Sequence, residues 1–497
     1  MIKKLTALAL CLCFFTALFT ACASDKKGSD AAESVQNEPA IPSDDSSFVL
    51  SYSQSDSLNP YESKAQNNQI LSQLVFESLF DIDDSFSATL NIASGYEYTN
   101  SKTLAVTIPD NLTFSDGAAL TADDITYSFR QAAESSGWGS SLSDISSCNA
   151  ASSTVIEFHL KHRNHYAHNL LIFPIISRNS ENSRFPIGNG RYYFAEENGE
   201  TVLKASQNET FSPHFTTIHL ENITAADSID NAVNIGNISL AFRDLSRDSS
   251  KKIEANCKTV NINNLVYIGI NNKSGITSNT YIRKAISLAV SRETLVKSAY
   301  GNYAKAATAL FNPDFELSTT EIFEKDANTA AAKQAVSQSG IANPSLSILV
   351  NSTNSDRVAC AKLVSRQLEE TGFSVNLIYA DTYEKYESRI TKEQFDLYIG
   401  EIKITSDMSL RPFFAENGNA HFGIDTEKCT AGKAYEDYLN GEEELGAVLL
   451  AFSEEMPYIP LLYRQGMICF SKEMNGDMQG TASDCFKNIE NWYFKTA

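Results

Sequence analysis

Four of the seven histidines lie within ten residues, at His159, His162, His165 and His168. Imidazole rings placed this close could ligate nickel, copper or zinc. A spacing of three residues, however, fits neither one face of a strand nor one sustained face of a helix. We expect residues 155–160 to form a strand that runs into a loop, so that the four rings diverge. The run is therefore a weak candidate for a metal site, and solvated surface histidines are the simpler interpretation.

Other residues offer no recognisable catalytic set. The sequence contains no HExxH, no GxSxG and no glycine loop that cradles phosphate. Adjacent acids occur at Asp83-Asp84, Asp123-Asp124 and Glu442–Glu444, but a chain with 61 acidic residues produces such pairs by chance. They are typical of helix caps and solvated faces. We expect neither an enzyme nor a bound cofactor.

The N-terminus has the layout of an export signal. Two lysines precede an uncharged apolar run over residues 5–21, which ends in Leu-Phe-Thr-Ala before Cys22. This ending resembles a bacterial lipobox, which predicts a signal peptide over 1–21 and a lipid on Cys22. A plain signal peptide or an uncleaved anchor are the alternatives. Residues 23–47 lack aromatics and are rich in Ser, Asp, Glu and Lys, so we expect 22–47 to be the lipidated cysteine and a flexible tether.

The net charge and the cysteine content limit the classes of partner and the kinds of cysteine site that we expect. The net charge of −21 argues against nucleic acid and anionic lipid headgroups as partners. Beyond Cys22 six cysteines remain, without CxxC spacing, which disfavours zinc and iron–sulfur sites. Export permits disulfides, and Cys469 with Cys485 is the closest pair, but spacing does not establish a bond. Buried free thiols remain an equal alternative. The six are Cys148, Cys257, Cys360, Cys429, Cys469 and Cys485.

Several elements follow from local physics. The stretch 107–130 predicts a strand, a turn at Phe114–Gly117 and a helix capped by Thr121, with two acids in its first turn. Residues 346–350, 356–371 and 374–379 predict a strand, an amphipathic helix and a second, parallel strand. We also expect a strand over 48–53 and a helix over 67–80.

The stretch 107–130 resembles a signature of the extracellular solute-binding proteins of family 5, the receptors of oligopeptide, dipeptide and nickel importers. In that family a strand leads into F-S-D-G, then T-A-x-D and a Y-S-F helix, and this chain carries all three pieces. The other matches, in family order, are Leu58–Pro60, Phe76–Phe80, Pro186–Tyr192, Tyr267–Asn271, a helix containing Ile282–Ile286 and Ser291–Glu293, Met456–Leu461 and Glu490–Tyr493.

The resemblance implies an α/β fold of the periplasmic-binding-protein type II, class C. Two main lobes of mixed β-sheets with flanking helices would enclose a ligand cleft, and a small third lobe would be inserted early. The expected boundaries are lobe I over 48–94, 186–262 and 456–497, lobe II over 95–185, and lobe III over 263–455.

The resemblance also implies which residues would contact a ligand. The family's D-L-x-x-G-W-x-x-D stretch supplies a glycine, an aromatic and an acid that pairs with a peptide's α-ammonium group. Here Gly400 fits, but Glu401 replaces the tryptophan, Ile404 stands where the acid should be, and Asp407 follows three residues later. Either Glu401 or Asp407 could supply the carboxylate. Arg389 falls where an arginine can meet a ligand carboxylate. The other expected contacts are Lys64, Gln66 and Asn67 after L-N-P, Trp138 from the second lobe, Tyr267 and Tyr398.

The implied function is that of a lipid-anchored, extracytoplasmic binding protein, held at the cell membrane through Cys22. It would act as a monomer, capture short peptides by hinge closure and deliver them to the permease of an ABC importer. A metal chelate of the nickel type or another small cationic solute is the alternative cargo. A surface sensor or adhesin that keeps the fold is the alternative class.

Overall fold

The computed structural model describes residues 47–495 except 181–182, 208–210 and 246–252. The expected signal peptide over 1–21, the lipidation site Cys22 and nearly all of the tether lie outside the described residues. Within them, no helix is long and apolar enough to cross a membrane.

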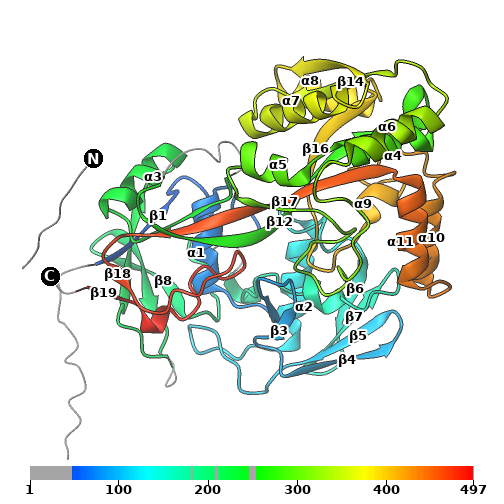
Figure 1. Ribbon diagram of the computed structural model, residues 1–497. Helices are drawn as coiled ribbons and strands as arrows, with labels where there is room; N and C mark the ends of the chain where they lie inside the picture. The colour runs from blue at the N-terminus through cyan, green and yellow to red at the C-terminus, as the bar shows by residue number, and fades with distance from the viewer. Residues whose placement is uncertain (1–46, 181–182, 208–210, 246–252, 496–497) are drawn as a thin grey trace, which may run out of the picture. The chain divides into compact units, whose positions relative to one another are not determined.

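Two long strands organise the described body. β12 (Asn256–Ile270) and β17 (Tyr458–Phe470) pair antiparallel along most of their lengths, with a register shift between Asn261 and Asn264. Both belong to one eleven-stranded mixed sheet. The two sheets expected for the main lobes are therefore joined into a single continuous ladder (Figure 1).

Strands from both ends of the chain build one half of this sheet. β1 runs parallel to both of its neighbours, β10 and β11, and β11 pairs with β17. The elements are β1 (Phe48–Tyr52), β8 (Tyr192–Glu197), β9 (Glu200–Ala205), β10 (Thr217–Asn222) and β11 (Leu240–Arg243), with helices α1 (Gln66–Val75) and α3 (Ala226–Ile235).

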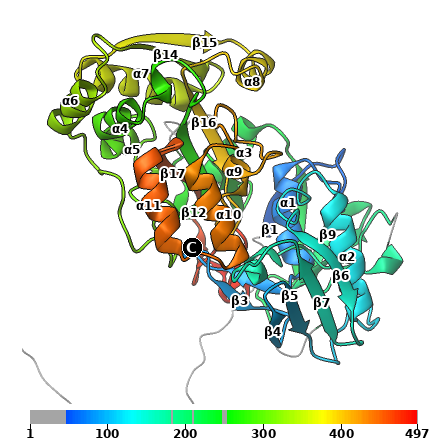
Figure 2. The same ribbon diagram turned by 90° about the vertical axis from the view of Figure 1, so that its right-hand side faces the viewer.

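The other half contains the predicted strand–helix–strand unit. β14 (Ser345–Asn351) and β15 (Ser374–Ala380) are parallel and joined by α7 (Ser355–Glu369), as the sequence predicts. β16 (Leu397–Lys403) pairs with both β14 and β12. Figure 2 shows this unit with the helices around it. The remaining elements are β13 (Ala304–Ala306), α4 (Thr280–Ala289), α5 (Arg292–Ser298), α6 (Thr329–Gln338), α8 (Tyr383–Thr391), α9 (Arg411–Phe414), α10 (Thr430–Asn440) and α11 (Leu445–Glu455).

A separate four-stranded sheet lies inside the range expected for the inserted lobe, whose boundaries stay predictions. Its order is β4 (Gly95–Asn100), β5 (Thr103–Thr107), β7 (Val155–Leu160) and β6 (Ile145–Ala150). Helix α2 (Ala122–Glu134) begins with a capping box in which the side chains of Thr121 and Asp124 bond each other's backbone N–H groups. The predicted turn at Phe114–Gly117 and the helix capped by Thr121 are confirmed, whereas the strand expected to begin at Thr107 already ends there as β5. Short strands complete the set: β2 (Phe80–Ile82) with β3 (Ala88–Leu90), and β18 (Met474–Asn475) with β19 (Tyr493–Phe494).

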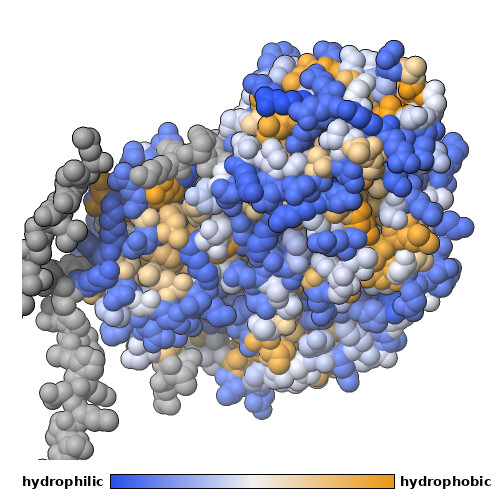
Figure 3. All heavy atoms as spheres, in the orientation of Figure 1, coloured by the Kyte–Doolittle hydropathy of each residue, from blue (hydrophilic) through white to orange (hydrophobic). Residues whose placement is uncertain are grey.

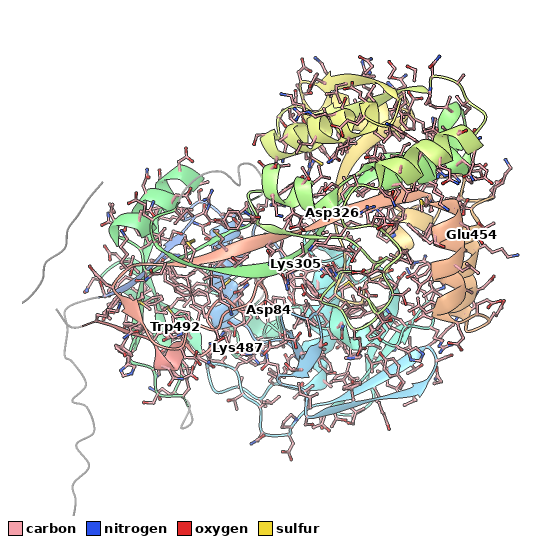
Figure 4. All side chains as sticks on the ribbon, viewed as in Figure 1. Asp84, Lys305, Asp326, Glu454, Lys487 and Trp492 are labelled. Atoms are coloured by element: carbon pink, nitrogen blue, oxygen red, sulfur yellow. A yellow bond between two sulfur atoms is a disulfide. The ribbon has the colours of Figure 1, made fainter. Side chains whose placement is uncertain are left out.

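Successive side chains of β12 point to opposite faces of the sheet, and each face packs against its own apolar core in the second half. Leu265 and Tyr267 pack into one apolar cluster, whereas Val266, Ile268 and Ile270 pack into the other. A third cluster joins the first half to the inserted sheet and contains Trp492, which is fully buried against Phe48, Phe470 and Phe486. Trp492 is labelled in Figure 4. The face drawn in Figure 3 is mostly hydrophilic with scattered apolar areas.

Two expected helices are wrong in extent. The helix expected over 67–80 ends at Val75, because the backbones of Glu77 and Phe80 pair with residues 171–175 instead. The single helix expected to contain 282–286 and 291–293 is two helices, since Ser291 caps the start of α5.

The structure also decides the cysteine pairing. Cys257 of β12 is bonded to Cys469 of β17 across 212 residues, so Cys485 is not the partner of Cys469. The other four described cysteines, Cys148, Cys360, Cys429 and Cys485, are free thiols.

A buried ion network joins four elements where the halves meet. Glu401 of β16 accepts from Arg464 of β17 at 2.6 Å, from Arg357 of α7 at 2.8 Å and from Asn264 of β12 at 2.9 Å. Arg464 also donates to the backbone carbonyl of Asp244, which follows β11 in the first half. Burial acts to raise the pKa of Glu401, but the two guanidinium groups outweigh it and the pKa is lowered.

Replacing Glu401 with Gln should lower the free energy of unfolding by about 3 kcal/mol, since two arginines lose their buried partner. Because the folded-state pKa is lowered, the wild-type contribution is complete above the ordinary value of 4.5 and is lost as the pH falls through the folded-state pKa. Urea unfolding of both proteins from pH 3 to 7 measures this. Asp381→Asn, which breaks an exposed pair with Lys385, is the control and should change little. An equal loss in the two variants would contradict the prediction.

Gly400 tests the packing between β16 and β12. A Cβ there would lie 2.5 Å from Cζ of Tyr267, its register partner, so Gly400→Ala should cost about 1–3 kcal/mol. Gly446→Ala is the matched control, because a Cβ at that helical position meets nothing within 4 Å. Its stability should be equal or higher. Thermal unfolding of the two variants compares them, and equal stability would refute the packing argument.

Candidate ligand-binding cleft

One large cleft opens within the described body, with a volume of about 890 Å³. Sites that enclose small ligands commonly have volumes of this order. Its walls come from the segment around α1 and β2, the loop 137–144 between α2 and β6, the middle of β12, the segment 402–419 and residues 481–484. Both halves of the large sheet and the segment that contains the four-stranded sheet therefore contribute to one cavity.

Asp407 is a buried carboxylate of this cleft that has no cation among its partners in the described part of the chain. It is 8% exposed and receives hydrogen bonds from Asn164 at 2.7 Å, from the Thr405 hydroxyl and from the Ser409 backbone. Burial raises its pKa, and the hydrogen bonds from Thr405 and Asn164 only partly oppose this. A cationic group would find an acceptor here that the protein has not neutralised.

Asn169 adds a second acceptor in the same wall. The residue lies in the short helical turn Ala167–Leu170 and is 1% exposed. Its amide nitrogen donates to the carbonyls of Phe86 at 2.9 Å and Ser406 at 3.1 Å. Because both partners are acceptors, the amide orientation is fixed and Oδ1 faces away from them. Among the described residues Oδ1 has no hydrogen-bond partner.

Glu401, the other candidate acid, does not line the cleft. Both of its carboxylate oxygens are occupied by arginines in the network described above. The geometry therefore favours Asp407 over Glu401 as the acceptor for a ligand cation.

Three further residues of the expected site lie in the core. Tyr267 and Tyr398 are buried, with their hydroxyl oxygens 3.2 Å apart. Each ring fills the space over a glycine on the neighbouring strand, Tyr267 over Gly400 and Tyr398 over Gly269. Neither the tyrosines nor Gly400 line the cleft. A packing requirement therefore explains the glycine in this stretch.

The remaining expected contacts divide between cleft and surface. Gln66 and Trp138 line the cleft, as does Asp407. Lys64 and Arg389 are exposed, and Asn67 donates to the carbonyl of Ile223 at 2.9 Å; none of these three lines the cleft. Arg389 therefore does not lie where it could bind a ligand carboxylate in the cleft.

The histidines do not converge. Within the described residues no group of three or more His, Cys, Asp or Glu side chains is arranged to hold a metal ion. His168 stacks on Tyr96, and burial lowers its pKa to about 4. His162 and His165 border a small pocket of about 40 Å³ that Asp407 also lines, and His159 contacts Thr103 on the neighbouring strand.

Most other charges of the cleft are already paired. Arg191 contacts Asp484 at 2.7 Å and Glu77 at 3.8 Å, and Arg411 contacts Asp144 at 2.9 Å. Asp81 lies near the Arg191 group, and burial together with Glu77 and Asp484 raises its pKa to about 6. Asp84, labelled in Figure 4, has one carboxylate oxygen buried without a partner in the described part of the chain.

Sequence reasoning did not find Asn164, Asn169 or Lys403, which also line this cleft or support it. The only local feature that could have indicated these three residues is that they are polar side chains near expected strand ends. Their roles depend on contacts between segments far apart in the chain: Asn164 and Asp407 are separated by 243 residues.

Comparisons with known proteins agree with this architecture. The chain is 22% identical to the oligopeptide-binding protein AppA of Bacillus subtilis (strain 168), with 99% of each chain covered. Among solved structures, the ABC transporter substrate-binding protein CtaP from Listeria monocytogenes has a TM-score of 0.71 at 19% identity, covering 91% of this chain and 99% of that one. NikA from Brucella suis in complex with Fe(III)-EDTA has a TM-score of 0.70 at 17% identity, covering 90% and 100%.

These structural likenesses show the fold, a type II periplasmic-binding-protein architecture. The family model for bacterial extracellular solute-binding proteins, family 5 (middle region), matches residues 89–420, about two-thirds of the chain. The chain therefore belongs to the bacterial extracellular solute-binding proteins of family 5.

Proposed function

We propose that this protein captures short peptides outside the cytoplasm and delivers them to the permease of an ABC importer. The observation that carries the proposal is Asp407, a buried carboxylate in the cleft whose partners are all neutral. A peptide's α-ammonium group is a cation of suitable size, and Oδ1 of Asn169 would accept a second of its N–H bonds. The Bacillus subtilis relative is an oligopeptide-binding protein, which agrees with this choice.

Closure of the cleft is the proposed mechanism. β12 and β17 run through both halves, so bending of these strands would bring the two walls together. A ligand drives closure only by binding the closed state better than the open one. A peptide that contacts α1, the loop at Trp138 and Asp407 would bridge three walls at once.

The proposal also includes the finer features expected from the sequence. The mature protein would be a monomer, anchored at the outer face of the cell membrane by a lipid on Cys22. We propose that ligand contacts include Gln66, Trp138 and Asp407, while Glu401 serves the ion network instead.

Native mass spectrometry of Ser24–Ala497, before and after denaturing release of bound molecules, tests the cargo directly. A series of masses that fit short peptides would support the proposal. A single adduct that fits a metal chelate or one metabolite would contradict it and favour the alternative cargo.

Asp407→Asn tests the site itself. Affinity for a free peptide should fall about 10- to 100-fold, the value of one charged hydrogen bond, and the N-acetylated peptide should bind wild type as weakly as the variant binds the free form. Ligand-free stability should change little, because removing the buried charge is offset by the loss of a hydrogen bond that one carboxylate oxygen of Asp407 accepts. Calorimetry and urea unfolding measure the two effects.

Asp381→Asn removes an exposed acid that is not among the residues lining the cleft and is the matched control. It should bind the free peptide as wild type does. Equal affinity of wild type for free and acetylated peptide would remove Asp407 from the role.

A further inference from the structure

Four cationic side chains line the cleft, and three of them are engaged. Arg191 and Arg411 form the ion pairs described above. The Lys161 ammonium donates to the carbonyl of Ser143 at 2.6 Å. The fourth, Lys403, stands at the last position of β16.

Lys403 is exposed to the solvent of the cleft, and its ammonium has no hydrogen bond or ion pair among the described residues. The protein that surrounds the cleft nevertheless replaces much of its bulk water. This partial desolvation lowers the pKa of Lys403, and the negative charge of Asp244 opposes the shift. An incompletely solvated ammonium gains from an anionic partner, because the partner replaces the missing solvation.

The position of Lys403 in the sequence also restricts which ligands can pair with its ammonium group. It precedes Asp407 by four residues, and four residues of fully extended chain span at most about 14 Å. One short segment thus presents an unpaired cation and an unpaired anion to the same cleft. This bound applies to the Cα atoms of the two residues, which therefore lie in neighbouring parts of the same wall. A small zwitterion, whose own charges lie at its two ends, offers a partner for each of these side chains.

We propose that Lys403 binds the carboxylate of the ligand, so that the cleft selects short peptides with a free C-terminus as well as a free N-terminus. This inference rests on the proposed function and deepens it. It also gives Lys403 the role for which the exposed Arg389 lies in the wrong place.

The experiment compares trialanine with trialanine amide by isothermal titration calorimetry, on wild type and on Lys403→Met. Wild type should bind the free acid about 10- to 100-fold more tightly than the amide. The variant should lose that factor for the free acid and bind the amide as wild type does. Lys403→Arg should restore most of the preference, since it restores a cation at the same position.

Lys161→Met and Arg389→Met are the matched controls. Lys161 is a cleft cation that already has an acceptor, and Arg389 is an exposed cation outside the cleft lining. Both variants should keep the wild-type preference for the free acid. If Lys403→Met weakened acid and amide equally, its effect would be a general change in the cleft and the inference would be overturned.

Two outcomes separate this inference from the proposed function. If wild type bound acid and amide equally well, peptide binding would stand and only the role of Lys403 would fall. If wild type bound neither, and neither did a panel of di- to pentapeptides, the proposed function would fall and this inference with it. Should Lys403→Met not fold, Lys403→Gln, which removes the charge but keeps a polar side chain of similar length, replaces it. It should lose the preference for the free acid in the same way, and an unchanged preference would overturn the inference.

Discussion

The buried carboxylate of Glu401 is the interaction on which the arrangement of the two halves depends. It draws together β16, β17, β12 and α7 at the middle of the continuous sheet, and Arg464 extends the same network to the backbone of Asp244 in the other half. A buried charge without partners would cost several kcal/mol, so these four elements can pack only with both arginines in place. The network therefore stabilises β16 close to its C-terminal end, immediately before the segment 404–409 that lines the cleft.

One short stretch of the chain carries both the charge that stabilises the fold and the charges that are proposed to bind the ligand. Glu401 faces the arginines and is neutralised, whereas Lys403 and Asp407 reach the cleft without ionic partners. The segment between them is held in place from β12: the amide of Asn263 donates to the carbonyls of Ile404 and Thr405. Asn263 itself adopts a positive φ of 57° in the register shift of β12, the point where the two halves meet. Bending at this point would move the segment that carries both charges, which couples closure to ligand contact.

Local sequence was sufficient where a few adjacent residues decide the structure. The Thr121 capping box, the turn before it and the β14–α7–β15 unit follow from capping and periodicity, and the apolar face of α7 packs as expected with Ala361, Val364 and Leu368 fully buried. The site was less predictable, because its charges are defined by partners distant in sequence. Glu401 could not be assigned to Arg464 without the pairing of β12 with β16 and β17. Tyr267, Tyr398 and Gly400 carry the family pattern, yet their ring-over-glycine packing places them in the core.

A binding site of this kind must be unfavourable when empty. Asp407 and Oδ1 of Asn169 are buried acceptors that the described protein leaves without a cation and without a donor, respectively. An unsatisfied buried acceptor such as Oδ1 of Asn169 costs about 1–3 kcal/mol, and the uncompensated charge of Asp407 adds to it. In the proposed mechanism this cost would lower the stability of the closed, ligand-free form relative to an open form in which water reaches the site. A ligand ammonium removes that cost only in the closed form. If Asp407 and Asn169 bind the ligand as proposed, the same groups that weaken the empty protein would supply the difference in affinity between the two states, which a receptor needs in order to close only on its cargo.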